Sequence, residues 1–228
     1  MLSIIFPTRN RPENLVRFHK SLVDTCSVMP EVVVYVDNDD VASIPVADKL
    51  GFKHIQGPRH ALSECYNEAF ALATGNLLMY GGDDLVFRTP GWDVMVENEF
   101  AQKKVILVHG DDQCHGGNAA ATHGILHRKW ADATGYFVPP YFESWFDMWL
   151  TDVANELNVR VYLPFVNEHM HFTISKAKYD STYSDAKYKQ YEDKRIYPTL
   201  VTQKQNYKNK LKRLIRQEGE TQQVKVIA

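Results

Sequence analysis

Short apolar segments alternate with amphipathic stretches along the chain. Uninterrupted apolar runs are typical of strands that are covered on both faces. The predicted strands are residues 3–6, 32–36, 52–55, 77–80, 105–108, 124–126 and 159–163. Apolar residues at helical spacing, such as Leu15, Phe18 and Leu22, predict helices between the strands. The predicted helices begin near Pro12 and Pro90 and cover residues 61–74, 128–134 and 143–157.

This alternation predicts an α/β fold with a mixed, mostly parallel sheet that is flanked by helices. Carboxylates follow the predicted strands at 32–36, 77–80 and 105–108. They are Asp37, Asp83, Asp84, Asp111 and Asp112. In open α/β sheets, ligands bind beyond the carboxyl ends of the strands. We therefore expect these acidic groups to meet at one site.

Composition is that of a globular protein rather than a disordered one. The chain has 228 residues, of which 44% are hydrophobic and 24% are charged. Its three cysteines, Cys26, Cys65 and Cys114, are too widely spaced for a disulfide framework or a CxxC metal site. The first apolar run breaks at Pro7, and no segment approaches the roughly 20 apolar residues of a membrane helix. We expect a protein that lies in the cytoplasm and does not cross a membrane.

The net charge of -2 conceals a strong difference between the two ends of the chain. Residues 1–171 carry 13 Lys and Arg against 22 Asp and Glu, whereas residues 172–228 carry 13 against 6. A basic segment of this kind either binds a polyanion or packs against the acidic remainder of the same chain. The change in composition divides the chain into a catalytic domain, residues 1–172, and a basic, Tyr/Lys-rich C-terminal extension, residues 173–228.

Asp83 and Asp84 are the first candidate for a metal site. Gly81 and Gly82 precede them and let the backbone turn closely around a ligand. Adjacent carboxylates repel each other when they are desolvated, and a bound cation removes that cost. Mg²⁺ and Mn²⁺ suit a site made of carboxylates and phosphate oxygens. The alternative is a solvated turn.

Two histidines, His169 and His171, follow the last predicted strand and offer imidazole ligands on one side of the chain. One of them would complete a metal shell that contains a carboxylate. A zinc hydrolase or deaminase would need further His or Cys ligands, and its H-x-E with P-C-x-x-C pattern is absent. The alternative is that each histidine is an ordinary surface or core residue.

A further candidate, Asp147, lies in an apolar, Trp-rich helical stretch, residues 145–149. Apolar surroundings raise the pKa of a carboxyl group, which suits a general base. The alternative is an acid on the polar face of an amphipathic helix.

Together, these residues resemble the family-2 glycosyltransferases of the GT-A fold over residues 1–172. The resemblance rests on IIFPTRNR at 4–11, the strand at 32–36 before Asp37, and LMYGGDD at 78–84. It also rests on the stretch at 66–75, from Tyr-Asn-Glu-Ala to Ala-Thr-Gly. The Pro-Gly-Trp at 90–92 and the Glu-His at 168–169 are similar to short, phage-encoded members that modify DNA.

The resemblance implies a role for particular residues. Asp84 and His169, with His171 as the alternative, would bind Mn²⁺ or Mg²⁺, and Asp147 would be the catalytic base of an inverting transfer. The residues implied to bind the donor are Pro7, Thr8, Arg9, Asp37, Arg59, Asn67 and Asp83. The chain departs from the family at Gly82, the first position of the D-x-D triplet, and at Phe146, where Glu is usual.

The implied function is a metal-dependent transfer of a sugar from a nucleoside-diphosphate sugar, with a UDP-sugar favoured, to an acceptor hydroxyl. Basic and aromatic residues interleave in the extension, as in Lys187-Tyr188, and predict contact with nucleic acid. The acceptor would then be a hydroxymethylated pyrimidine in viral DNA, modified in the host cytoplasm. The alternative for the extension is a helix that packs through Leu211, Leu214 and Ile215.

Other functions remain open at this point. A glycosyltransferase for a polysaccharide or lipid-linked acceptor fits the same motifs. A non-catalytic module that binds nucleotide sugar or nucleic acid is suggested by Gly82. A nucleotidyltransferase is disfavoured, because the segment 7–11 lacks the glycines of a G-x-G-x-R loop.

Overall fold

The computed structural model describes residues 1–227, with the side chains of residues 185–188 and 221–227 outside the description. Lys187 and Tyr188 are thus among the residues whose side chains are not described. The strands are β1 (Leu2–Thr8), β2 (Glu31–Asp37), β3 (Lys53–Gly57), β4 (Leu77–Tyr80), β5 (Leu85–Phe87), β6 (Leu107–Asp111), β7 (Ile125–His127) and β8 (Arg160–His169).

Helices separate most of these strands. They are α1 (Pro12–Thr25), α2 (Ser43–Leu50), α3 (Leu62–Phe70), α4 (Trp92–Gln102), α5 (Arg128–Thr134), α6 (Phe146–Glu156), α7 (Ser181–Ile196) and α8 (Val201–Ile227), with short 3-10 helices at Phe172–Ile174 and Tyr197–Thr199. Among the described residues, no helix combines the length and the apolar character that crossing a lipid bilayer requires.

The strands form one sheet in the order β3-β2-β1-β4-β7-β6-β8-β5. β1 pairs in parallel with β2 and β4, β2 with β3, and β6 with β8. Because β7 is antiparallel to both β4 and β6, these two strands run in the same direction. The carboxyl ends of β1, β2, β3, β4, β6 and β8 therefore lie at one edge, and the predicted mixed, mostly parallel sheet is confirmed.

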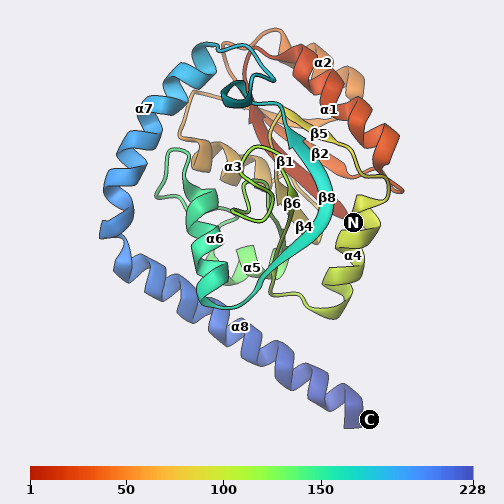
Figure 1. Ribbon diagram of the computed structural model, residues 1–228, viewed down its shortest axis with the longest axis vertical. Helices are drawn as coiled ribbons and strands as arrows, with labels where there is room; N and C mark the ends of the chain where they lie inside the picture. Colours follow the sequence, from red (N-terminus) through yellow and green to blue (C-terminus); the bar gives the residue numbers. More distant parts are fainter. Residues whose placement is uncertain (228) are drawn as a thin grey trace.

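Helices flank this sheet, with α1, α2 and α4 on one side and α3, α5 and α6 on the other (Figure 1). An aromatic cluster fills the space beneath each group. On the α1 side, the Phe87 ring stacks on Trp92 with 4.2 Å between centroids and also contacts Phe18. On the other side, the Tyr80 ring lies 5.6 Å from the Phe146 ring. Burial of such rings stabilises the fold by about 2 kcal/mol each.

Most predicted elements are present, and the differences have local causes. The helix α2 was not predicted; it begins with Pro45 in its first turn, where proline is tolerated, and ends at Gly51 with φ of 73°. The short strand β5 was not predicted either. β8 extends to His169, so this histidine ends the strand instead of following it.

The C-terminal extension packs against the rest of the chain, as the docking alternative predicted. Figure 1 shows α7 along one side of the body and α8 passing beneath α5 before its end projects outward. Tyr207 accepts a hydrogen bond from the Trp130 indole at 2.7 Å, and Leu211 is fully buried. Leu214 and Ile215 are partly buried against the same core.

Candidate active site

A cavity of about 240 Å³ lies at the edge where the parallel strands end. Its wall contains most of the side chains that the sequence predicted for donor and metal binding. These are Pro7, Thr8, Arg9, Asp37, Arg59, Asp83, Asp84, His169 and His171. Arg11, His123, Tyr183 and Lys189, which were not predicted as site residues, also line it.

Backbone hydrogen bonds hold the ends of three strands together at this cavity. The amide of His169 donates to the carbonyl of Asp112 at 2.9 Å, which joins β8 to the end of β6. The amide of Met170 donates to the carbonyl of Asp84 at 2.8 Å, which joins the end of β8 to the segment after β4. The expected convergence of separate acidic segments on the late histidines is therefore present.

Asp83 is buried in a network of donors at the amino-terminal side of the cavity. Its carboxylate accepts hydrogen bonds from Thr8 Oγ1 at 2.7 Å and Asn14 Nδ2 at 3.3 Å, and Arg11 Nη1 lies 3.4 Å away. Burial and the neighbouring Asp84 charge raise the pKa of Asp83, while Arg11 opposes the shift. The side chain is fixed by these partners and joins β1, α1 and the segment after β4.

Gly82, where the family pattern has an acid, leaves the space beside Asp84 clear. A Cβ atom at this position would lie 2.8 Å from Asp84 Oδ1, so a side chain there would force the carboxylate to move. The local structure therefore has no room for an acidic side chain at position 82 unless the Asp84 carboxylate moves.

Asp84 is the second buried carboxylate, and its Oδ2 atom faces two partners. His169 Nε2 lies 3.2 Å away, and the Tyr183 hydroxyl donates at 3.2 Å. Burial by itself would raise the pKa of Asp84, but the His169 charge lowers it overall. Burial likewise acts to lower the pKa of His169, and the Asp84 carboxylate outweighs it and raises that pKa to about 10. The two groups form an ion pair in a desolvated setting.

The residues present fit a divalent cation at this position. A desolvated carboxylate and an adjacent imidazole are ligands that transition metals accept, and a cation would take the place of the imidazolium proton. His123 lies beside them, with its ring 4.9 Å from the His169 ring, and both of its nitrogens are buried without a hydrogen-bond partner among the residues that the structure describes. Unsatisfied buried nitrogens are uncommon and favour a missing ligand.

The two late histidines differ in position. His169 contacts Asp84, whereas His171 Nδ1 bonds with Thr173 Oγ1 at 2.8 Å and its ring packs on Tyr183. Burial and the His169 charge lower the pKa of His171 to about 4, so its ring is neutral. His171 lines the cavity, but within the described part of the chain it makes no contact with Asp84.

Arg9 and Asp37 meet at the opposite end of the cavity. Arg9 Nη1 lies 2.7 Å from Asp37 Oδ2 and 2.6 Å from Asp39 Oδ1, so one guanidinium bridges the ends of β1 and β2. Asp37 is buried and Arg59 lines the same wall. These side chains add polar groups to the wall of the cavity, whose total volume is about 240 Å³.

Two predicted residues lie outside the cavity wall. The Asn67 amide is used within the fold, because it donates to the carbonyls of Ser63 and Val138 and accepts from the amide of Phe137 at 2.8 Å. It therefore fastens α3 to the loop before α6 and does not face the cavity as expected. Asp147 lies in the first turn of α6, half-buried, and its Oδ1 accepts from the amide of Met148 at 2.7 Å. Burial raises the pKa of Asp147 to about 6.

Sequence reasoning missed Arg11 and Tyr183. Arg11 bonds with Asp180 at 2.7 Å and its guanidinium lies 4.4 Å from the centre of the Tyr183 ring. The nearness of Arg11 to the predicted strand end was an available signal. Nothing in the sequence places Tyr183, which is about a hundred residues beyond Asp84 (99 positions), at the same carboxylate.

Comparison with known proteins agrees with this geometry. Residues 3–110 match the family described as glycosyl transferase family 2. No curated protein matches the chain in sequence. Among solved structures, a mannosyltransferase from Pyrobaculum calidifontis in complex with GDP-Man and Mn²⁺ aligns with a TM-score of 0.58 at 14% identity, covering 75% of this chain and 57% of that one.

Two further structures align comparably. Glucosyl-3-phosphoglycerate synthase from Mycobacterium tuberculosis, in complex with Mn²⁺, UDP and its product, has a TM-score of 0.56 at 14% identity, over 75% of this chain and 72% of that one. S. aureus TarS 1-349 in complex with UDP-GlcNAc has a TM-score of 0.58 at 15% identity, over 81% and 63%. The chain spans less than two thirds of the mannosyltransferase (57%) and TarS (63%) chains. At these identities the likeness concerns the fold.

Proposed function

We propose that this chain, whose residues 3–110 match the family described as glycosyl transferase family 2, is a glycosyltransferase of the GT-A fold that transfers a sugar from a nucleoside-diphosphate sugar to an acceptor hydroxyl. The observation that carries the proposal is the pairing of Asp84 with His169 in the cavity that Asp37 and Arg9 also line. This places a candidate cation site and a candidate nucleoside site in one space.

Asp84 and His169 are the proposed ligands of Mn²⁺ or Mg²⁺. Related structures contain Mn²⁺ with UDP-glucose or with GDP-Man. When bound, the cation would offset the negative charge that develops on the departing diphosphate. The imidazole ligand favours Mn²⁺, since Mg²⁺ prefers oxygen ligands. His171, which does not contact Asp84, is the weaker candidate.

The donor residues divide between the two ends of the cavity. Asp37 and Arg59 would accept and donate hydrogen bonds to the nucleoside, and Pro7, Thr8 and Arg9 would form the floor at the end of β1. UDP-sugars are the favoured donors, because UDP or UDP-sugars are bound in several of the similar structures.

Positive charge for the diphosphate is available from two further side chains. Arg11 lies next to Asp83, so Asp83 would orient the guanidinium rather than touch the donor. Lys189 of α7 lines the same cavity. Both charges come from residues that face the space between the nucleoside end and the Asp84 end.

Asp147 is the proposed base for an inverting transfer. An acceptor hydroxyl has a pKa far above 7, so a carboxylate that removes its proton as the bond forms lowers the barrier. The raised pKa of Asp147, about 6, makes it a better base than an ordinary aspartate. Its position in the first turn of α6, outside the cavity wall, requires the acceptor to approach from the α6 side.

The acceptor we propose is a hydroxymethylated pyrimidine in viral DNA, modified in the host cytoplasm. Support comes from α8, where Lys212, Arg213 and Arg216 are exposed and available to phosphates. Other basic residues of the extension are paired within the chain, as Lys204 and Lys208 are with Glu156. A polysaccharide or lipid-linked acceptor is the alternative, and steeply salt-dependent binding to duplex DNA distinguishes the two.

The test is release of nucleoside diphosphate from a panel of UDP- and GDP-sugars with Mn²⁺ present. We expect Asp84→Asn to lower the rate at least about 100-fold, because electrostatic stabilisation of the leaving group is lost. Asp48→Asn, an exposed acid of α2 away from the cavity, is the matched control. Nucleotide-sugar binding without any turnover would instead indicate a non-catalytic module.

A further inference from the structure

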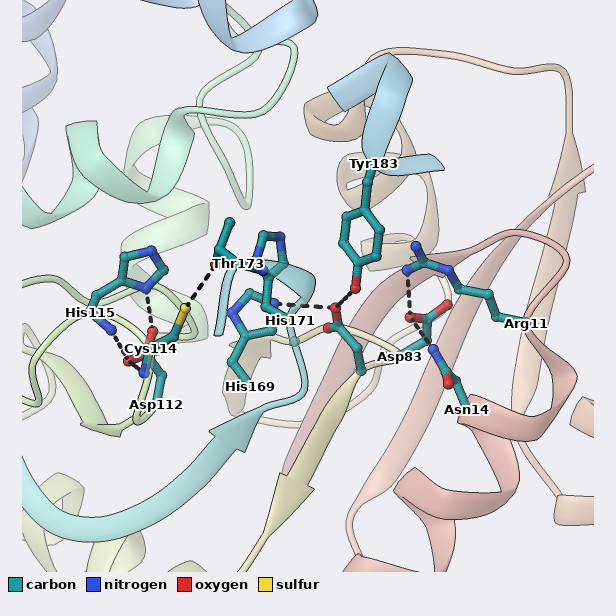
Figure 2. Close-up of polar contacts among 12 residues, drawn as sticks. Arg11, Asn14, Asp83, Asp112, Cys114, His115, His169, His171, Thr173 and Tyr183 are labelled. Carbon is teal, nitrogen blue, oxygen red and sulfur yellow. Dashed lines mark hydrogen bonds and ion pairs between the residues drawn. The ribbon is translucent and has the colours of Figure 1, made fainter. Parts of the chain in front are cut away.

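A second group of metal-ligating atoms lies beside the Asp84 pair. One ligand atom each from Cys114, His115 and His169 lies within 4.8 Å of the other two. Cys114 and His115 belong to the loop after β6, and His169 ends β8. Figure 2 shows the His169 ring between the Cys114 thiol on one side and the carboxylate near Tyr183 on the other.

His169 presents its two ring nitrogens to different surroundings. Nε2 lies 3.2 Å from Asp84 Oδ2, whereas Nδ1 is buried and has no hydrogen-bond partner among the described residues. A carboxylate on one imidazole nitrogen fixes the ring so that the other nitrogen is free for a metal. Leaving that nitrogen buried without a partner costs stability, so the arrangement favours a ligand at Nδ1.

The loop that carries the other two groups is held by Asp112. Asp112 Oδ1 accepts from the amides of Cys114 and His115, each at 2.9 Å, and Oδ2 lies 2.7 Å from His115 Nδ1. These contacts hold the thiol and the imidazole beside the end of β8, near His169. Thr173 Oγ1, 3.8 Å from Cys114 Sγ, is the remaining polar neighbour of the sulfur.

The chemistry of the group is softer than that of the Asp84 pair. Cys114 offers a sulfur atom, and His115 and His169 each offer an imidazole nitrogen. Thiolate and imidazole together select Zn²⁺ and similar ions, whereas Mg²⁺ and Mn²⁺ prefer carboxylate and phosphate oxygens.

We propose that Cys114, His115 and His169 bind Zn²⁺, or another thiophilic divalent cation, in the state in which His169 Nε2 keeps its proton and donates it to Asp84, so that zinc here and a cation on Nε2 exclude each other. The site uses His169 Nδ1, opposite the nitrogen that faces Asp84. Tetrahedral zinc with bonds of about 2.0–2.3 Å needs ligand atoms about 3.5 Å apart, so the three groups must approach by about 1 Å. The loop, which contains Gly116 and Gly117 at positive φ, has the freedom to do so.

Such an ion would fasten the loop after β6 to the end of β8. On binding, the Cys114 thiol and Nδ1 of the His169 imidazolium release their protons to solvent, and the fourth coordination position stays open to water. The proposal does not depend on sugar transfer, because it concerns only what these three side chains bind.

Cobalt provides the test, because Co²⁺ replaces Zn²⁺ and its bond to a thiolate absorbs in the near ultraviolet. We expect metal-free protein to develop this absorption on Co²⁺ titration and to lose it when Zn²⁺ is added. Cys114→Ser should abolish the band, and Cys26→Ser, which changes another half-buried free cysteine, should leave it unchanged. Circular dichroism checks that each variant is folded.

Two further variants separate this site from the proposed catalytic one. His115→Ala should weaken Co²⁺ binding at least about 10-fold. Asp84→Asn should retain the thiolate band at saturating Co²⁺. Its affinity for Co²⁺ should fall by about 10–100-fold, because the Asp84 carboxylate no longer orients the His169 ring. Absence of the band in the wild-type protein, or its persistence in folded Cys114→Ser, would overturn the zinc site and leave the glycosyltransferase proposal standing.

Discussion

At the scale of single residues, the Asp84 carboxylate decides whether the cavity holds a cation. Its Oδ2 atom already has two neighbours, His169 Nε2 and the Tyr183 hydroxyl, each 3.2 Å away. The imidazole is itself a metal ligand once it loses its proton, but the phenol is not expected to ionise, because burial raises the pKa of Tyr183. A cation at Asp84 must therefore displace the hydroxyl.

Removal of that hydroxyl should strengthen cation binding. The hydrogen bond of a hydroxyl to a carboxylate contributes about 1.5 kcal/mol, so Tyr183→Phe should lower the Kd for Mn²⁺ about 10-fold. The measurement is a titration of free Mn²⁺ by electron paramagnetic resonance without donor. Tyr179→Phe, a change to an exposed tyrosine nearby, is the control. A weaker affinity in Tyr183→Phe would mean that the hydroxyl supports the cation instead.

Asp147, the proposed base, also affects the stability of the fold. Burial raises its folded-state pKa to about 6, above the ordinary value near 3.9. The folded protein thus binds the proton more tightly than the unfolded chain does, so stability falls as pH rises from about 4 to about 6. Above about pH 6, the ionised Asp147 carboxyl lowers the free energy of unfolding by a constant amount.

We therefore expect Asp147→Asn to stabilise the protein more at pH 7 than at pH 4. The difference should be about 1–2 kcal/mol, because the group is only half-buried and solvent screens part of its charge. Urea unfolding of both proteins at the two pH values gives the number. An equal effect of the substitution at both values would show that the carboxyl titrates normally.

At the scale of elements, α7 and α6 are joined by one buried carboxylate. Asp193 of α7 accepts from the amides of Glu143, Ser144 and Trp145 at 2.8, 2.6 and 2.8 Å. These amides lie in the segment that leads into α6, whose first helical residue is Phe146. The extension therefore holds the approach to α6, and with it the first turn that contains Asp147.

Loss of the Asp193 carboxylate should destabilise the whole fold. Asp193→Ala leaves three part-buried amides without their acceptor, and we expect it to lower the free energy of unfolding by about 2–4 kcal/mol. Glu192→Ala removes an acid that pairs with Arg195 on the surface and should cost less than about 1 kcal/mol. Chemical denaturation of the two variants in parallel measures the difference.

At the scale of the whole molecule, the extension completes the core rather than following it. The Tyr207 ring lies 4.8 Å from the Trp149 ring and its hydroxyl bonds with the Trp130 indole. Asp180 and Tyr183 reach the cavity from the same extension. Residues 1–172 therefore form neither the complete core nor the complete site.

A chain that ends at residue 172 should consequently fail to fold cooperatively. It would expose the aromatic surface around Trp130 and Trp149, and we expect it to bind a hydrophobic dye and to lack a sharp thermal transition. Leu211→Ala in the full chain removes part of the same packing, and we expect it to lower the free energy of unfolding by about 2–4 kcal/mol. A sharp thermal unfolding transition of the 172-residue chain, with the same midpoint temperature as that of the full chain, would contradict this view.

Local sequence patterns were enough for the elements that carry the site. The apolar run at 32–36 and the Gly-Gly-Asp-Asp at 81–84 predicted a buried strand and an acidic turn because such patterns reflect neighbouring residues alone. They also predicted that carboxylates would meet late histidines, since parallel strands end at the same edge. Asn67 shows the limit of such local patterns. It was predicted to bind the nucleotide-sugar donor, but its side-chain amide instead bonds with the backbone of the loop before α6.

By itself, the sequence determined the α/β architecture, the edge at which the acidic groups gather and the two histidines that lie at that edge. Only the tertiary structure decided which histidine faces Asp84, that Arg11 contacts Asp83 and Tyr183 contacts Asp84, and that Asp193 of the extension holds the segment before α6. These outcomes depend on contacts between residues far apart in the chain, such as Asp84 and Tyr183. Their free energy comes from packing and desolvation around specific partners, and no local pattern of residues encodes those partners.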